Sequence, residues 1–166
     1  MVRRKRIIVV IDLAGFAKAF ESVADEKMVA FLHDYYAACE KPLAAKGGDV
    51  IKFIGDACLA VFDSRRPEIA VEAVREVVSS MSALNKKHKL KLTVGANLHL
   101  AFAMDVAFNI GSDKRKDIIG RAVNETFRLG RGPGVRISES FYRALAASSR
   151  SIWSKQGPAV TYYLDA

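Results

Sequence analysis

Several residue types and patterns are scarce in this sequence, and each absence removes a class of protein. Only two cysteines, Cys39 and Cys58, occur in 166 residues, and both lie in apolar surroundings. This predicts two buried free thiols in a reducing compartment, and hence a cytoplasmic protein, rather than a disulfide-stabilised secreted domain. No apolar run approaches the ~20 residues of a membrane-spanning helix, so we expect no transmembrane segment in this chain. The apolar run behind the basic start ends at Asp12, which is too early for a signal peptide.

Composition and charge narrow the possibilities further. The chain is 51% hydrophobic and contains no repeats or low-complexity segments, so we expect a single domain over residues 1–166 with a core of about 6–165. A net charge of +8 favours an anionic partner. Basic and aromatic residues do not alternate regularly, so we expect no nucleic-acid binding. No spacing of His and Cys resembles a zinc site.

The pattern between residues 47 and 62 predicts a β-hairpin. Two β-rich runs, 49–54 and 57–62, flank a tight turn at Gly55 and Asp56. Lys52 interrupts an otherwise apolar strand, so its charge must reach water or a partner. Asp56 lies on the turn, where its carboxylate can point out of the sheet, although turn chemistry alone also accounts for an aspartate there.

A second aspartate ends another predicted strand. The β-branched run 7–11 indicates a buried strand that ends at Asp12, and Gly15 follows in a turn that leads into a helix. Backbone N–H groups at such a helix N-terminus favour anions. Helix capping is the alternative explanation for Asp12.

The remaining pattern predicts an α+β protein with a mainly antiparallel sheet and packed helices, of the ferredoxin-like kind. We expect His88 to be solvated and His99 to be a packed strand residue. The expected elements are a helix over 25–45 that ends or kinks near Pro42, a helix that opens at Pro67 and closes in the charged stretch 85–89, two strands within 91–108 separated near Asp105, a polar loop over 109–117, a helix over 119–129, a strand over 135–137, a helix capped by Ser138, and strands near 152 and over 160–164.

Three segments taken together resemble the catalytic domain of class III nucleotidyl cyclases. They are residues 11–16 (IDLAGF), residues 47–57 (GGDVIKFIGDA), and residues 117–124 (DIIGRAVN) with Arg128. The resemblance runs from about Arg6 to Asp165. It implies the cyclase fold, with a ferredoxin-like core, and a homodimer whose active sites lie at the subunit interface.

The resemblance also implies an adenylate cyclase that converts ATP to 3′,5′-cyclic AMP and pyrophosphate. Asp12 and Asp56 would hold a pair of Mg²⁺ or Mn²⁺ ions in each active site, because such ions need carboxylate oxygens beside phosphate and water. Backbone N–H groups near Gly15 and Phe16 would cradle the triphosphate. Lys155 is a weaker candidate for a triphosphate contact, because Ser154 falls nearest the aligned position.

The remaining site residues follow from the same resemblance. Asn124 would orient the ribose and Arg128 would stabilise charge on the reacting phosphate. Lys52 and Asp117 occupy the base-reading positions. A Lys donor opposite N1 and an Asp acceptor opposite the N6 amino group suit adenine, and guanine inverts both groups.

Departures from the family pattern keep a second hypothesis open. Ala17 stands where many members carry Thr, and Phe108 and the pair Ala101-Phe102 stand where Gly is common. A degenerate cyclase-homology domain, which binds nucleotide or a partner without catalysis, is therefore the alternative. The presence of both aspartates, the asparagine and the arginine favours the enzyme.

Overall fold

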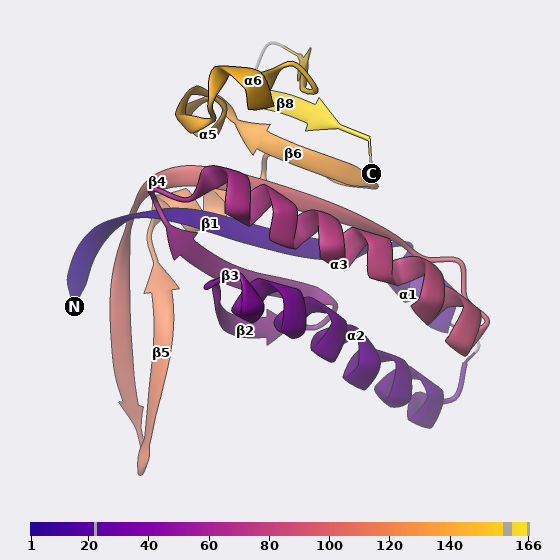
Figure 1. Cartoon of the computed structure of the whole chain (residues 1–166). Helices are drawn as coiled ribbons and strands as arrows, with labels where there is room; N and C mark the ends of the chain where they lie inside the picture. Colours follow the sequence, from indigo (N-terminus) through magenta and orange to yellow (C-terminus); the bar gives the residue numbers. More distant parts are fainter. Residues whose placement is uncertain (22, 158–160, 166) are drawn as a thin grey trace.

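One mixed sheet forms the centre of the molecule in the computed structural model, which describes residues 1–21, 23–157 and 161–165 (Figure 1). The sheet has eight strands in the order β2-β3-β1-β4-β6-β8-β7, with β5 paired to β4. All pairs are antiparallel except β4 with β6. The elements are β1 (Val2–Ala14), α1 (Phe16–Phe20), α2 (Asp25–Ala45), β2 (Asp49–Ile54), β3 (Ala57–Asp63), α3 (Pro67–His88), β4 (Thr93–Ile110), β5 (Asp113–Ile119), α4 (Arg121–Phe127), β6 (Gly134–Ser138), α5 (Glu139–Ala144), α6 (Ala147–Arg150), β7 (Ser154–Gln156) and β8 (Thr161–Leu164).

The two long helices pack side by side on one face of the sheet (Figure 1). Their sequences explain this, because apolar residues recur every three or four positions and form one stripe per helix. In α2 the stripe is fully buried and consists of Phe31, Tyr35, Cys39 and Leu43. Pro67 begins α3, where its missing N–H costs no helical hydrogen bond.

Both faces of the central strand β1 are buried. Ile7, Val9 and Ile11 point into the core beneath α2 and α3, whereas Ile8 and Val10 belong to a smaller cluster on the opposite face. That cluster also contains Ile118 of β5 and Ala122 of α4, among other residues. The opposite face of the sheet is therefore covered by the end of β5 and by α4, the elements that carry the predicted site residues Asp117 and Asn124.

The mixed α+β architecture with a mainly antiparallel sheet confirms the predicted fold class, and the predicted hairpin is present as β2 and β3. Both thiols are buried and free. Within the described ranges, no helix is long and apolar enough to cross a membrane.

The region after α3 differs from the prediction. Residues 93–110 form one continuous strand rather than two, because Asp105 is paired with the guanidinium groups of Arg6 and Arg4 and need not leave the sheet. The predicted polar loop is instead a hairpin with β5, joined through Gly111 and Ser112. Gly111 has φ of 61°, the left-handed conformation that such a two-residue turn requires.

Smaller corrections concern helix ends and one histidine. The helix α2 continues past Pro42 to Ala45, and α4 is shorter than predicted. His88 is not solvated, because its ring bonds Asp34 at 2.6 Å and meets the edge of Phe31. His99 is a packed strand residue, as predicted. The final strand begins at Thr161, and the first residue of its predicted range, Val160, lies outside the described residues.

Candidate functional site

Asp12 and Asp56 meet at one end of the sheet. Asp12 lies near the end of β1, still paired with Gly95 of β4, so it is a strand residue and not a turn residue. The pairing of β1 with β3 ends at Ile11 and Cys58, which brings Asp12 alongside Asp56 on the β2–β3 turn. The two carboxyl groups lie close enough for the charge of Asp56 to raise the pKa of Asp12.

The electrostatics of this pair favour a bound cation. Asp12 is accessible to solvent as a residue, yet partial burial of its carboxyl group raises its pKa, and the charge of Asp56 raises it further. Two carboxylates in contact repel each other, and a divalent cation between them would relieve that repulsion. Over the described ranges, no group of three or more His, Cys, Asp and Glu side chains converges. Two carboxylates without a third protein ligand fit Mg²⁺, which completes its shell with phosphate and water.

Lys52 and Asp117 form an ion pair that joins β2 to β5. The Lys52 Nζ donates to Asp117 Oδ2 at 2.6 Å, although the residues are 65 apart in sequence. The other carboxylate oxygen of Asp117 accepts from the backbone N–H of Ile118 at 2.8 Å, which fixes the carboxylate orientation. The irregular register of β2 between Val50 and Lys52 accompanies this contact, and β2 is an edge strand, so the lysine reaches its partner without crossing the core.

A cavity of about 350 Å³ lies beside this ion pair. Lys52 of β2 and Asn124 of α4 both line it, together with apolar residues. The walls include the side chains of Ile54, Leu59, Ile118, Ile119, Val123 and Phe127. An apolar slot that has a lysine at one side, held by the adjacent Asp117, and an amide at another can hold a flat heterocycle and read its polar edge.

Arg128 follows directly after α4. It keeps near-helical backbone angles (φ −95°, ψ −3°), so Asn124 and Arg128 still share one side of this turn. Both side chains are exposed to solvent. Asn124 lines the cavity beside Lys52, whereas Arg128 lies at the C-terminal end of the same helix.

A second, smaller cavity of about 200 Å³ contains Asp12. It is also lined by Asn97 of β4 and by Arg131 in the glycine-rich loop after α4. The two cavities share Phe127 among their lining residues, and neither brings Asp12 together with Lys52. Neither Asn97 nor Arg131 was singled out from the sequence. A polar residue in the apolar run 92–104 was the available signal for Asn97.

Two predicted triphosphate contacts, Gly15 and Lys155, lie in different parts of the fold. Gly15 precedes α1 with φ of 83°, a left-handed conformation that glycine adopts without strain, so a glycine suits the turn where the triphosphate is expected. Lys155 is exposed on β7, which is the edge strand opposite β2. Within this chain, neither of the two cavities that hold predicted site residues includes Lys155.

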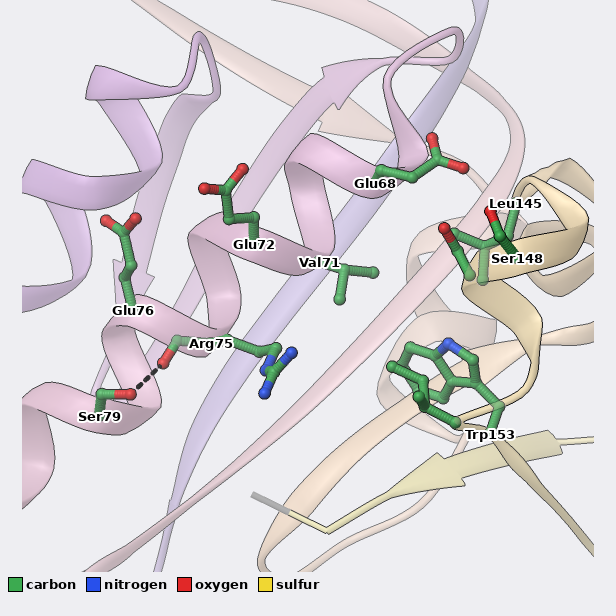
Figure 2. A pocket seen from close by; sticks show the side chains of 11 residues that line it. Glu68, Val71, Glu72, Arg75, Glu76, Ser79, Leu145, Ser148 and Trp153 are labelled. Atoms are coloured by element: carbon green, nitrogen blue, oxygen red, sulfur yellow. Dashed lines mark hydrogen bonds between the residues drawn. The ribbon is translucent and has the colours of Figure 1, made fainter.

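A larger cavity of about 470 Å³ lies on the helix-covered side, between α3 and the segment around α6 (Figure 2). It holds none of the predicted site residues. Its acidic residues already have partners, since Glu72 and Glu76 bind Lys46 and Glu68 accepts the backbone N–H of Ala146. We therefore take the convergence of charged groups, and not cavity size, as the basis for the candidate site.

Comparisons with known proteins identify the family of the chain. The family model described as the adenylate and guanylate cyclase catalytic domain matches residues 4–164. The chain is 27% identical over 158 residues to an adenylate cyclase of Anabaena cylindrica, covering 86% of this chain and 31% of that protein. It is 29% identical over 134 residues to adenylate cyclase 2 of Rhizobium meliloti (strain 1021), covering 77% and 37%. The chain thus spans about a third of the length of these relatives.

Solved structures share the fold. The adenylyl cyclase CyaB from P. aeruginosa superimposes with a TM-score of 0.86 at 19% identity, covering 99% of this chain and 95% of that one. The guanylyl cyclase Cya2 gives a TM-score of 0.84 at 20% identity, covering 98% and 91%. The same backbone thus occurs with either substrate named, so the choice of base must be argued from side chains.

Proposed function

The chain belongs to the family of adenylate and guanylate cyclase catalytic domains, and from that premise we propose that it converts ATP to 3′,5′-cyclic AMP and pyrophosphate. The observation that carries the choice of ATP is the contact between Lys52 Nζ and Asp117 Oδ2 at 2.6 Å. It holds a donor and an acceptor side by side, and the donor Lys52 lines the cavity that also contains Asn124 and Ile118, the residue next to Asp117.

Adenine matches this pair in both positions. Lys52 donates to N1, which is an acceptor in adenine, and Asp117 accepts from the N6 amino group. Guanine places an N–H at position 1 and an oxygen at position 6. The Lys52 donor would therefore face a donor, and the Asp117 acceptor would face an acceptor. A site that leaves buried polar groups unpaired rejects the wrong ligand strongly. The nearby Ile54, Ile118 and Phe127 would cover the faces of the base.

The reaction joins the 3′-oxygen of the ribose to the α-phosphorus and breaks the bond to the pyrophosphate oxygen. Asn124 holds the ribose so that the 3′-hydroxyl faces the phosphorus. Arg128 donates to the oxygens of the α-phosphate as charge builds on them. Backbone N–H groups at Gly15 and Phe16 hold the triphosphate, and Lys155 is a further triphosphate contact only if a second subunit brings it there.

Asp12 and Asp56 are the proposed metal ligands. When bound, Mg²⁺ or Mn²⁺ lowers the pKa of the attacking hydroxyl and neutralises charge on the leaving pyrophosphate. The role of this chain is to present two adjacent carboxylates at the end of β1, with the β2–β3 turn fixing the second one. The mutual repulsion of the pair supports this assignment, because a cation removes it.

The protein acts as a homodimer in this proposal, with each active site shared between subunits. Asp12 and Asp56 come from one subunit, and Lys52, Asp117, Asn124 and Arg128 come from the other. Within one chain Asp12 lines one cavity, whereas Lys52 and Asn124 line another, and this supports such sharing. Two inactive variants test it: in a mixture of D56A and R128A subunits, half of the dimers carry one intact site, so activity recovers to about a quarter of wild type by two-fold symmetry. No recovery despite verified subunit exchange would place each site within one chain.

The direct test incubates purified protein with ATP or GTP and with Mg²⁺ or Mn²⁺, and identifies the product by mass spectrometry. Cyclic AMP formed faster than cyclic GMP is the expected result. D56N removes one carboxylate charge and abolishes turnover, whereas D63N, the same substitution at the far end of β3, preserves it. Nucleotide binding without product would instead establish the degenerate alternative, and faster formation of cyclic GMP would overturn the assignment of the base.

A further inference from the structure

A buried asparagine lies in the middle of β4 on the site face of the sheet. Asn97 is 6% exposed, whereas its sequence neighbours Ala96 and Leu98 point to the other face of the sheet and belong to the apolar core there. Burying an amide is unfavourable unless its polar atoms are hydrogen-bonded. The contacts of this side chain therefore need an explanation beyond packing.

The Asn97 amide nitrogen donates two hydrogen bonds to the segment that carries Arg128. Its Nδ2 lies 3.0 Å from the carbonyl oxygen of Thr126 and 3.0 Å from that of Gly130. The Thr126 carbonyl also accepts from the backbone N–H of Leu129 at 3.3 Å, so Asn97 adds a second donor at this helix end. The two bonds clamp the backbone on both sides of Arg128.

The orientation of the amide follows from these acceptors. Turning the amide over would place its oxygen against two carbonyl oxygens, whereas the present orientation pairs both carbonyls with one NH₂ group. The Oδ1 atom then lies buried with no protein partner among the described residues. Asn97 lines the small cavity together with Asp12 and Arg131.

We propose that Asn97 is the positioning residue for Arg128, and hence that it governs the reactivity of the phosphate without touching it. This inference rests on the proposed function only for its effect on turnover. The exposed Arg128 side chain depends on the backbone turn for its direction. Another polar contact from β4 to α4, between His99 Nε2 and Glu125 Oε2 at 3.5 Å, holds an earlier part of the helix.

Two variants remove the donor in different ways. N97D keeps the shape but turns a carboxylate toward both carbonyls, and N97L removes the donor without adding charge beside Asp12. The matched control is N85D, because the Asn85 amide also donates to a backbone carbonyl, that of Leu92 at 2.8 Å, but from the last turns of α3. Amide hydrogen exchange of residues 127–131 is measured first, since it needs no catalysis. We expect exchange there to rise about 10-fold in N97D and N97L and to stay unchanged in N85D.

Turnover supplies the second measurement. N97L lowers kcat by about 10-fold at saturating metal while KM for ATP stays within about threefold, because the lost interaction acts in the transition state. In an R128A background the same substitution causes no further loss, since nothing is left to position. A purely structural role would lower kcat by the same factor in both backgrounds.

The outcomes separate this inference from the proposed function. A wild-type protein that makes no cyclic nucleotide refutes the function, while hydrogen exchange still decides whether Asn97 holds the turn. Unchanged exchange at 127–131 in both variants, or an undiminished effect of N97L in the R128A background, overturns the role of Asn97. If N97D does not melt cooperatively, N97L alone carries the comparison.

Discussion

The two faces of the sheet differ in what they bury. The face beneath α2 and α3 belongs to a core cluster of 27 described residues, whereas the buried cluster on the opposite face has seven. The second face instead holds Asn97 and His99 under α4 and, at its edges, the acidic pair and the Lys52–Asp117 ion pair. The difference indicates that one face contributes most of the apolar burial and that the other holds the polar and charged groups of the proposed site.

Replacing an aromatic side chain on the helix face tests the first half of this contrast. Phe31 is fully buried between α1, α2 and α3, with its ring stacked near Tyr35. We expect F31A to lower the free energy of unfolding by about 3–5 kcal/mol, because truncation leaves a cavity. Denaturant unfolding measures this, and F102A, at a ring that is 55% exposed, serves as the control with a change of less than about 1 kcal/mol. Equal losses in both variants would contradict the contrast.

Replacing Arg128 tests the other half. R128A lowers kcat by about 10²–10³, the usual loss when one donor to a developing charge is removed. Its melting temperature should stay near that of wild type, because the exposed side chain packs against little. The control is R121A on the same helix, whose guanidinium binds Glu125. A large loss of stability in R128A, or an equal loss of turnover in R121A, would remove Arg128 from the reaction.

Exchanging the donor and the acceptor of the Lys52–Asp117 pair tests whether these two residues on the site face determine the preference for ATP over GTP. K52E together with D117C reverses the donor and acceptor pattern, and we expect the preference for ATP over GTP to fall about 10-fold or more. Some GTP turnover is expected to appear. The ratio of kcat/KM for the two nucleotides is the measurement. A double variant that keeps the wild-type ratio would show that other residues read the base.

The smallest expected effect concerns His99. Burial lowers the pKa of His99 despite the opposing charge of Glu125. As pH falls below the ordinary histidine pKa of about 6.5, the unfolded chain takes up a proton that the folded chain resists, so the free energy of unfolding decreases. H99Q flattens that part of the stability curve by about 1 kcal/mol or less. Thermal melts between pH 5 and 8 reveal it, and identical slopes for both proteins would exclude His99 as the cause.

Local sequence patterns predicted those parts of the fold that depend on local order. The helices Asp25–Ala45 and Pro67–His88 follow from apolar periodicity, and the β2–β3 hairpin follows from its turn. The continuous strand β4 could not be predicted in this way, because the partner that keeps Asp105 in the sheet is Arg6, 99 residues away.

The candidate site likewise contains contacts between distant residues that local sequence patterns could not predict. Combined motifs indicated Asp12, Asp56, Lys52 and Asp117 as a set, and the structure brings them together as two pairs. Nothing local marks Asn97 as a partner of the segment after α4, since the two carbonyls it binds lie 29 and 33 residues later. Lys155 matched a motif only loosely, and its position on β7 leaves its role a prediction.

The long pairing of β1 with β4 has a consequence for how the chain folds. The register joins Val2 with Asp105 and Ala14 with Thr93, so the central strand gains its second neighbour only after about a hundred residues are available. Contacts of such high sequence separation slow folding, because loop closure must precede their stabilising effect. During synthesis on the ribosome, β1 can pair with β3 early, yet its other edge stays open until β4 emerges. An unpaired apolar strand edge is a template for aggregation, so this interval is where the chain depends most on rapid synthesis or on a chaperone.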